Sequence, residues 1–234
     1  MKHGIEFKNV SKIYRKGRNE VVVHKDLNMA IGKGEFVALM GPSGSGKTTL
    51  LNMMGGLDQP TDGQVLVGNK LISKSTEAEL TRWRARHVGF VFQFNHLLPV
   101  LNAFANVELP LTLTTLSKAK RRKQVETALA MVGMSERANH LPKELSGGQE
   151  QRVAIARAIV SDPVLLLCDE PTGNLDRKTA DAILLVLQIL NRDFGKTIVM
   201  VTHDGKAADF ATRVINLENI VNAKADAAMS GVPA

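Results

Sequence analysis

The sequence predicts an α/β fold in which helices cover both faces of a mostly parallel sheet. In the second half of the chain, short apolar runs alternate with longer segments whose apolar residues recur at helical spacing. Such alternation is typical of parallel strands joined by helices. In addition, an apolar run at residues 35–40 leads into a glycine-rich loop and then a helical segment at residues 47–54. That strand–loop–helix order places a loop at the carboxyl end of a parallel strand.

Turn residues divide the first part of the chain into short runs of strand character. The expected strands are residues 4–10, 21–29, 35–40, 64–67 and 87–92. A polar turn at residues 15–19 separates the first two runs, and a Pro-Thr-Asp-Gly turn precedes the fourth. Gly68 and Asn69 then provide a hairpin turn. We therefore expect an antiparallel β subdomain beside the parallel sheet.

After these strands the chain changes to helical character. Helices are expected at residues 118–132, 149–160 and 179–192, with strands at residues 164–168 and 197–202 and a final helix and strand. We place a helical insertion at residues 94–161. A single domain at residues 1–221 then has a core formed by residues 1–93 and 162–221. The alanine-rich segment 222–234 is expected to be disordered.

Composition excludes several classes of protein. The net charge is +7, but the basic residues lie in short groups and only 4% of residues are aromatic, so we expect no nucleic-acid function. The longest apolar runs fall far short of the ~20 residues that a membrane span needs, and the start shows no secretory signal. The single cysteine, Cys168, excludes an internal disulfide and favours a reducing cytoplasm. We expect it to be a small buried side chain.

The glycine-rich loop fits the full phosphate-binding pattern G-x-x-x-x-G-K-[ST]. Its residues are Gly41, Pro42, Ser43, Gly44, Ser45, Gly46, Lys47 and Thr48, and Thr49 follows. Glycines let backbone N–H groups approach phosphates, and the next helix adds a favourable dipole. Lys47 is expected to reach the β- and γ-phosphates, and Thr48 to bind Mg²⁺. A Gly/Ser-rich loop could instead merely turn the chain, but the flanking strand and helix favour a nucleoside triphosphate site.

Two carboxylates follow the buried strand at residues 164–168. Asp169 is placed to hold Mg²⁺, and Glu170 to act as general base or to orient the attacking water. Such a pair can also serve only a helix dipole. Ligands bind at the carboxyl ends of strands in open α/β sheets, however, and the phosphate-binding loop is expected at the same edge. The catalytic interpretation is therefore favoured.

The sequence KELSGGQEQR at residues 143–152 distinguishes this chain from a general phosphate-loop protein. Ser146, Gly147, Gly148 and Gln149 could form an ordinary helix-capping turn. In their context, however, they resemble the signature motif of ABC transporter nucleotide-binding subunits, and the resemblance covers about residues 5–217. It implies the P-loop NTPase fold with a RecA-like core. It also implies that the signature of one subunit closes over ATP bound to another, in a dimer that holds two ATP molecules.

The same resemblance implies roles for four more residues. Tyr14 corresponds to an adenine-stacking aromatic, although it could belong to the core. Gln93 corresponds to a glutamine that contacts Mg²⁺ or water. Asp176 lies in an Asn-Leu-Asp sequence that matches the D-loop at the nucleotide interface, and His203 matches a γ-phosphate sensor.

Sequences around Gln93 and after Glu170 are similar to the lipoprotein-release, macrolide-export and cell-division group of ABC ATPases. The resemblance implies a membrane permease-type partner with a periplasmic domain, an indirect membrane association and a place on the cytoplasmic side of the bacterial inner membrane. Ala105 departs from the glutamate that is more usual in this group, near the expected partner surface.

Two other functions are compatible with the motifs. One is a soluble ABC ATPase that works with a scaffold-assembly complex, although the FVFQFNHLLP sequence around Gln93 argues against it. The other is an interaction module that uses ATP only to dimerise. It is disfavoured because Lys47, Asp169, Glu170 and His203 are all present.

Overall fold

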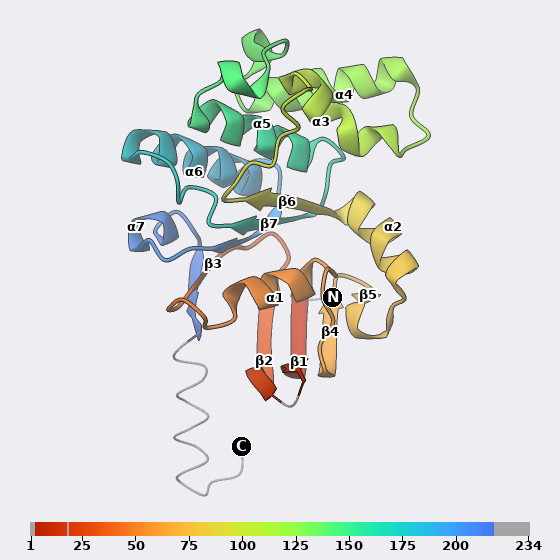
Figure 1. Ribbon diagram of the computed structural model, residues 1–234, viewed down its shortest axis with the longest axis vertical. Helices are drawn as coiled ribbons and strands as arrows, with labels where there is room; N and C mark the ends of the chain where they lie inside the picture. The colour runs from red at the N-terminus through yellow and green to blue at the C-terminus, as the bar shows by residue number, and fades with distance from the viewer. Residues whose placement is uncertain (1–2, 18, 218–234) are drawn as a thin grey trace, which may run out of the picture.

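Two sheets and a group of helices form the molecule (Figure 1). A computed structural model describes residues 3–17 and 19–217. The expected disordered segment 222–234 lies outside the described residues. The antiparallel sheet has the order β2-β1-β4-β5 and consists of β2 (Asn19–Gly32), β1 (His3–Lys16), β4 (Asp62–Val67) and β5 (Lys70–Leu71). The parallel sheet has the order β6-β7-β8-β3-β9 and consists of β6 (Val88–Phe92), β7 (Leu165–Asp169), β8 (Thr197–Val201), β3 (Phe36–Met40) and β9 (Arg213–Asn216).

The α/β fold and its antiparallel subdomain are thus confirmed, but the first two strands are longer than predicted. β1 and β2 each extend over 14 residues, and their ends pair from Tyr14↔Val21 to Lys16↔Asn19. The predicted strands are too short because the residues beyond the apolar runs are polar. In the structure, backbone hydrogen bonds continue to pair β1 with β2 at those polar positions, with several register shifts.

The helices lie where periodicity predicted them, with additions. They are α1 (Lys47–Met54), α2 (Glu77–His87), α3 (Ala103–Thr112), α4 (Lys118–Met131), α5 (Gly147–Ile159), α6 (Arg177–Arg192) and α7 (Gly205–Ala208). Short 3-10 turns occur at Ile72–Lys74, Ser135–Arg137 and Pro142–Glu144. Helix α2 was not predicted, because it has little apolar periodicity. Its first residues nevertheless carry a sequence signal for a helix start, since Thr76 and Glu79 form a reciprocal capping box.

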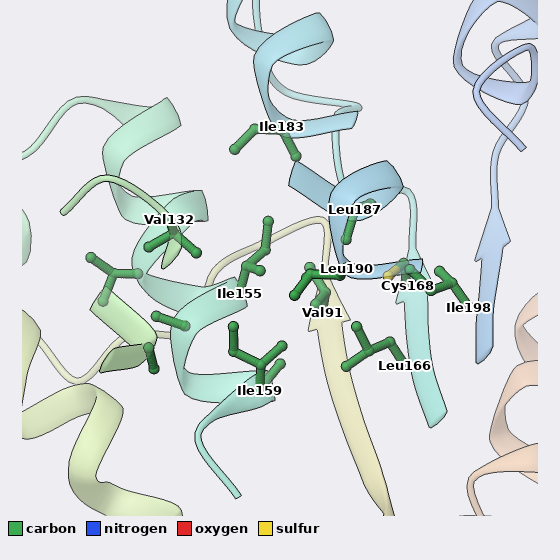
Figure 2. Close-up of a cluster of buried hydrophobic side chains, with 14 of the residues drawn as sticks. Val91, Val132, Ile155, Ile159, Leu166, Cys168, Ile183, Leu187, Leu190 and Ile198 are labelled. Carbon is green, nitrogen blue, oxygen red and sulfur yellow. The ribbon is translucent and has the colours of Figure 1, made fainter. Parts of the chain in front are cut away.

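The strands of the parallel sheet divide their side chains between two cores. Leu166 and Cys168 of β7 point into one core, together with Ile183 and Leu187 of α6 (Figure 2). The intervening Leu167 points into the other, between the sheet, α1 and the antiparallel strands. Burial raises the pKa of the Cys168 thiol, in agreement with the small buried side chain that the sequence predicted.

This two-sided burial fixes where the polar loops can lie. Because the paired strands of the sheet are parallel, their carboxyl ends share one edge, and the loops after β3, β6, β7 and β8 all begin there. Helices α3, α4 and α5 lie together beyond β6, toward the top of the view (Figure 1).

Replacing Leu187 by alanine tests the first core. Leu187 is fully buried, so Leu187→Ala is expected to lower the free energy of unfolding by about 2–5 kcal/mol through lost burial and a residual cavity. Leu185→Ala is the matched control, because Leu185 lies on the same helix with 51% of its surface exposed. Urea denaturation measures both. Equal losses in the two variants would contradict this assignment of the core.

Candidate nucleotide-binding site

The loop between β3 and α1 has the geometry of an anion site. Gly46 is the N-cap of α1, with a φ of 84° and no side-chain capping bond, so the first N–H groups of the helix are directed toward the loop. The Lys47 ammonium donates hydrogen bonds of 2.7 Å to the carbonyl oxygens of Gly41 and Pro42. One cation and a helix N-terminus therefore face the same hollow, which favours an anionic ligand.

Thr48 and Asp169 bring two kinds of oxygen together at the end of β7. The Thr48 hydroxyl donates to the Asp169 carboxylate, with an Oγ1–Oδ2 distance of 3.2 Å. Desolvation by burial raises the pKa of Asp169 in spite of the lowering effect of that hydrogen bond, and the charge of Glu170 raises it further. A hydroxyl and a partly desolvated carboxylate at this spacing are donors that suit Mg²⁺.

Glu170 and His203 form a second polar pair at the same edge. Nδ1 of His203 lies 3.0 Å from Oε1 of Glu170. The Glu170 backbone has a φ of 46°, and its N–H donates to the Val201 carbonyl at 3.0 Å. A pocket of about 540 Å³ lies at this edge and contains Thr48, Glu170 and His203 in its lining, whereas Asp169 lies beside Thr48 outside the lining. Its lining residues are Val23, Ser43, Gly44, Gly46, Lys47, Thr48, Thr49, Glu170, Val201 and His203.

Gln93 follows β6 and lies beside this pocket without lining it. Its amide donates to Oδ1 of Asn174 at 3.2 Å. Gly173 leaves room for that contact, because a Cβ there would lie 3.0 Å from Nε2 of Gln93 and 3.3 Å from Oε2 of Glu170. Gln93 is therefore joined to the loop that follows Glu170. The sequence places Asn174 in the Asn-Leu-Asp motif but gives no sign of its contact with Gln93.

Tyr14 also lies outside the lining of the phosphate pocket. Its hydroxyl donates to Oδ2 of Asp58 at 2.6 Å, and the Lys12 ammonium lies 4.6 Å from the ring centroid. The ring is partly exposed and does not belong to either apolar core. Burial is the largest of the causes that raise the pKa of its hydroxyl, followed by the bond to Asp58. Adenine stacking stays a prediction.

The signature residues cap α5 and lie apart from the phosphate pocket of the same chain. Ser146 accepts a hydrogen bond from the Gln149 N–H at 3.3 Å, and Gln149 Oε1 accepts one from the Ser146 N–H at 2.9 Å. Gly148 is required for close packing, since a Cβ there would overlap the Thr179 side chain. None of the four signature residues, Ser146, Gly147, Gly148 and Gln149, lines the pocket at Lys47.

Asp176 caps the next helix, α6. Its carboxylate accepts hydrogen bonds from the backbone N–H of Thr179 at 3.1 Å and from the Thr179 hydroxyl at 2.6 Å. The hydroxyl bond is the largest of the causes that lower the pKa of Asp176. In this structure Asp176 thus has a capping role, and the nucleotide contact that the resemblance implied stays a prediction.

His24 supports the phosphate-binding loop and was missed by the sequence analysis. It lies on β2, is almost completely buried, and places Nε2 at 3.1 Å from the Gly46 carbonyl oxygen. Because a carbonyl only accepts, Nε2 carries the proton in this contact. Desolvation by burial lowers the pKa of His24. In the sequence His24 follows valines of a predicted strand, and nothing in this pattern indicates a hydrogen bond to a residue 22 positions away.

The comparisons with known proteins agree with the geometry. The profile of the ABC transporter family matches residues 24–173. The chain belongs to the ABC transporter family. It is 48% identical to an ABC transporter ATP-binding protein of Methanocaldococcus jannaschii, over 92% of this chain and 93% of the relative. It is 46% identical to the lipoprotein-releasing system ATP-binding protein LolD of Acinetobacter baylyi, over 92% and 95% of the two chains.

Solved structures extend the likeness to three dimensions. A dimeric, post-hydrolysis structure of the ATP-binding cassette MJ0796 with ADP and Pi matches with a TM-score of 0.82 and 46% identity, over 91% of this chain and 93% of that one. Another dimeric structure of the same cassette matches with a TM-score of 0.83 and 47% identity over the same shares. Both the family and the P-loop fold predicted from the sequence are confirmed, and the chain is an ATP-binding cassette ATPase.

The buried His24 makes stability depend on pH. Its pKa is lowered in the folded protein. At acidic pH, therefore, His24 binds a proton in the unfolded chain more readily than in the folded chain. This contribution opposes folding once the pH falls below about 6.5, the ordinary pKa of histidine. We expect His24→Leu to lose less stability than the parent chain between pH 7.5 and 5.5, measured as the shift of the urea midpoint.

The control for that comparison is His96→Gln, because His96 is exposed on the surface. Its urea midpoint is expected to follow the parent chain at both pH values. A His24→Leu variant with the same pH dependence as the parent would show that folding does not lower the pKa of this histidine.

Proposed function

We propose that this chain is the ATP-hydrolysing subunit of a transporter and works as a dimer on a membrane partner. The observation that carries the proposal is the convergence of Lys47, Thr48, Glu170 and His203 on one pocket, with the Asp169 carboxylate bonded to the Thr48 hydroxyl beside it. The Ser-Gly-Gly-Gln sequence at the start of α5 and the similarity to dimeric cassettes support hydrolysis at a dimer interface, as in ABC transporters.

In the proposed reaction the loop from Gly41 to Thr49 holds the phosphates of ATP. Backbone N–H groups and the Lys47 ammonium bind the β- and γ-phosphates. Thr48 and Asp169 would hold Mg²⁺, with Gln93 as an additional ligand to the ion or its water. When bound, the ion neutralises charge on the phosphate oxygens. The 3.2 Å approach of the two side chains and the raised pKa of Asp169 support this choice of ligands.

Glu170 is proposed to accept a proton from the attacking water, or to orient that water, while His203 senses the γ-phosphate. The water oxygen bonds to the γ-phosphorus, the bond to the bridging oxygen breaks, and ADP and phosphate leave. The 3.0 Å contact between His203 and Glu170 supports roles for both side chains at one phosphate group.

The dimer follows from the separation of the signature from the phosphate pocket within one chain. We infer that Ser146 to Gln149 of one copy cover the ATP held by Lys47 of a second copy, with Asp176 close to the same interface and Tyr14 stacked on adenine. The free N–H groups at the start of α5 supply an anion site that suits a γ-phosphate. The dimeric relatives support a homodimer.

A membrane permease-type partner with a periplasmic domain is proposed from the lipoprotein-releasing relatives. This chain would then bind from the cytoplasmic side of the inner membrane. None of the helices described here is both long and apolar enough to cross a membrane. The proposed helical insertion, residues 94–161, carries exposed apolar side chains at Phe94, Leu98 and Val100 near Gln93. Such a patch suits a protein partner, and Ala105 lies shortly after it in sequence.

Removing the carboxylate of Glu170 tests the catalytic assignment. Glu170→Gln keeps the size of the side chain but cannot accept the proton, so ATP hydrolysis is expected to fall by about 10²–10⁴-fold. ATP should still bind, and size-exclusion chromatography with light scattering should show a stable dimer in ATP. Glu136→Gln, at an exposed position, is the control. Hydrolysis that stays unchanged in Glu170→Gln would show that another group is the base.

A charge in the exposed apolar patch tests the partner surface. Val100 is 82% exposed, and Val100→Glu is expected to abolish co-purification of a membrane protein from detergent-solubilised native membranes while the isolated subunit still hydrolyses ATP. Leu113→Glu is the matched control, since Leu113 is 88% exposed at the end of α3. Recovery of a soluble assembly complex instead of a membrane protein would favour the scaffold alternative.

A further inference from the structure

The edge of the parallel sheet opposite the ATP pocket has a groove of its own. β7 and β8 begin at Leu165 and Thr197, and both residues line it, whereas Glu170 and His203 lie at the other ends of these strands. A five-residue strand spans about 16 Å, so the two sites are separate. In Figure 1 the arrows of β6 and β7 point away from α2, which lies on the groove side.

Two adjoining cavities form this groove, which we call the basal groove. One has a volume of about 450 Å³ and lies between α4 and the ends of α5 and α6. The other has a volume of about 690 Å³ and extends past Trp83 of α2. Phe194 and Lys196 line both. Phe194 is 53% exposed and Val164 is 56% exposed, so large apolar side chains face solvent along the groove.

The rim of the basal groove is positively charged. Lys120 and Lys123, on one face of α4, line the first cavity, and Lys33 lines the second. Within the described residues, none of these three exposed lysines has a carboxylate partner. Lys196 is different, because it pairs with Asp162. The groove therefore combines an apolar floor with three uncompensated cations.

The shape and charge of the basal groove indicate what kind of molecule fits. Apolar side chains and the three lysine ammonium groups line its two cavities. Carboxylates of a protein partner complement these cations, which favours an acidic segment. A membrane surface is bound by protruding apolar side chains, but here the apolar surface is concave.

We propose that the basal groove binds an acidic, amphipathic segment of a protein partner. Apolar side chains of the segment pack between Met131 and Phe194, and its carboxylates face Lys120, Lys123 and Lys33. This site is distinct from the catalytic pocket and from the patch around Val100, so the subunit can engage a second protein while it turns over ATP.

The probe for this proposal is a fluorescein-labelled peptide that forms a helix with leucines on one face and glutamates on the other. Fluorescence anisotropy on the full chain is expected to show saturable binding. Lys120→Glu combined with Lys123→Glu should weaken it by about tenfold or more, and Phe194→Ala should also weaken it. A peptide of the same pattern with lysine in place of glutamate should not bind.

The matched control combines Lys118→Glu with Arg122→Glu, which makes the same change of charge on α4 outside the groove. It is expected to change the affinity by less than about twofold. The ATP hydrolysis rate of each variant verifies that it is folded. Equal losses in the two double variants would show unspecific attraction and overturn the proposal. Binding to phosphatidylglycerol vesicles that requires Lys120 and Lys123, without binding of the peptide, would overturn it in favour of a lipid surface.

Discussion

The shared edge of the parallel strands is the constraint on which the rest of the structure depends. The central strands β3, β7 and β8 are buried on both faces, so polar groups gather where these strands end. Lys47, Glu170 and His203 come from distant parts of the chain, yet register brings them to the lining of one pocket. Packing of apolar residues therefore determines the geometry of these polar groups before any of them contacts a ligand.

Much of this arrangement could be predicted from the sequence because the signals are local. The spacing of Gly41, Gly46 and Lys47 defines a loop, and the apolar run before Asp169 defines a strand. Glu170 and His203 each follow such a run, and their side chains lie 3.0 Å apart. Their roles stay predictions.

What could not be predicted depends on contacts across the sequence. The bond from His24 to Gly46 and the bond from Gln93 to Asn174 join residues whose identities suggest nothing about each other. The polar ends of β1 and β2, from Tyr14 to Lys16 and from Asn19 to Glu20, were not predicted for the same reason. They are strands because they pair with each other and not because of their composition. For α2, the capping box was visible in the sequence, but its helix lacks the apolar periodicity that the prediction relied on.

The backbone of Glu170 has a consequence for the evolution of this protein. A φ of 46° is a conformation that costs a side-chain-bearing residue about 1–2 kcal/mol and costs glycine very little. At this position, therefore, replacement of Glu170 by glycine relieves that cost and at the same time removes the carboxylate. Under the proposed role of Glu170, the residue that is best for stability at this position is not the residue that is best for hydrolysis, so stable cassettes without activity are a single substitution away from active ones.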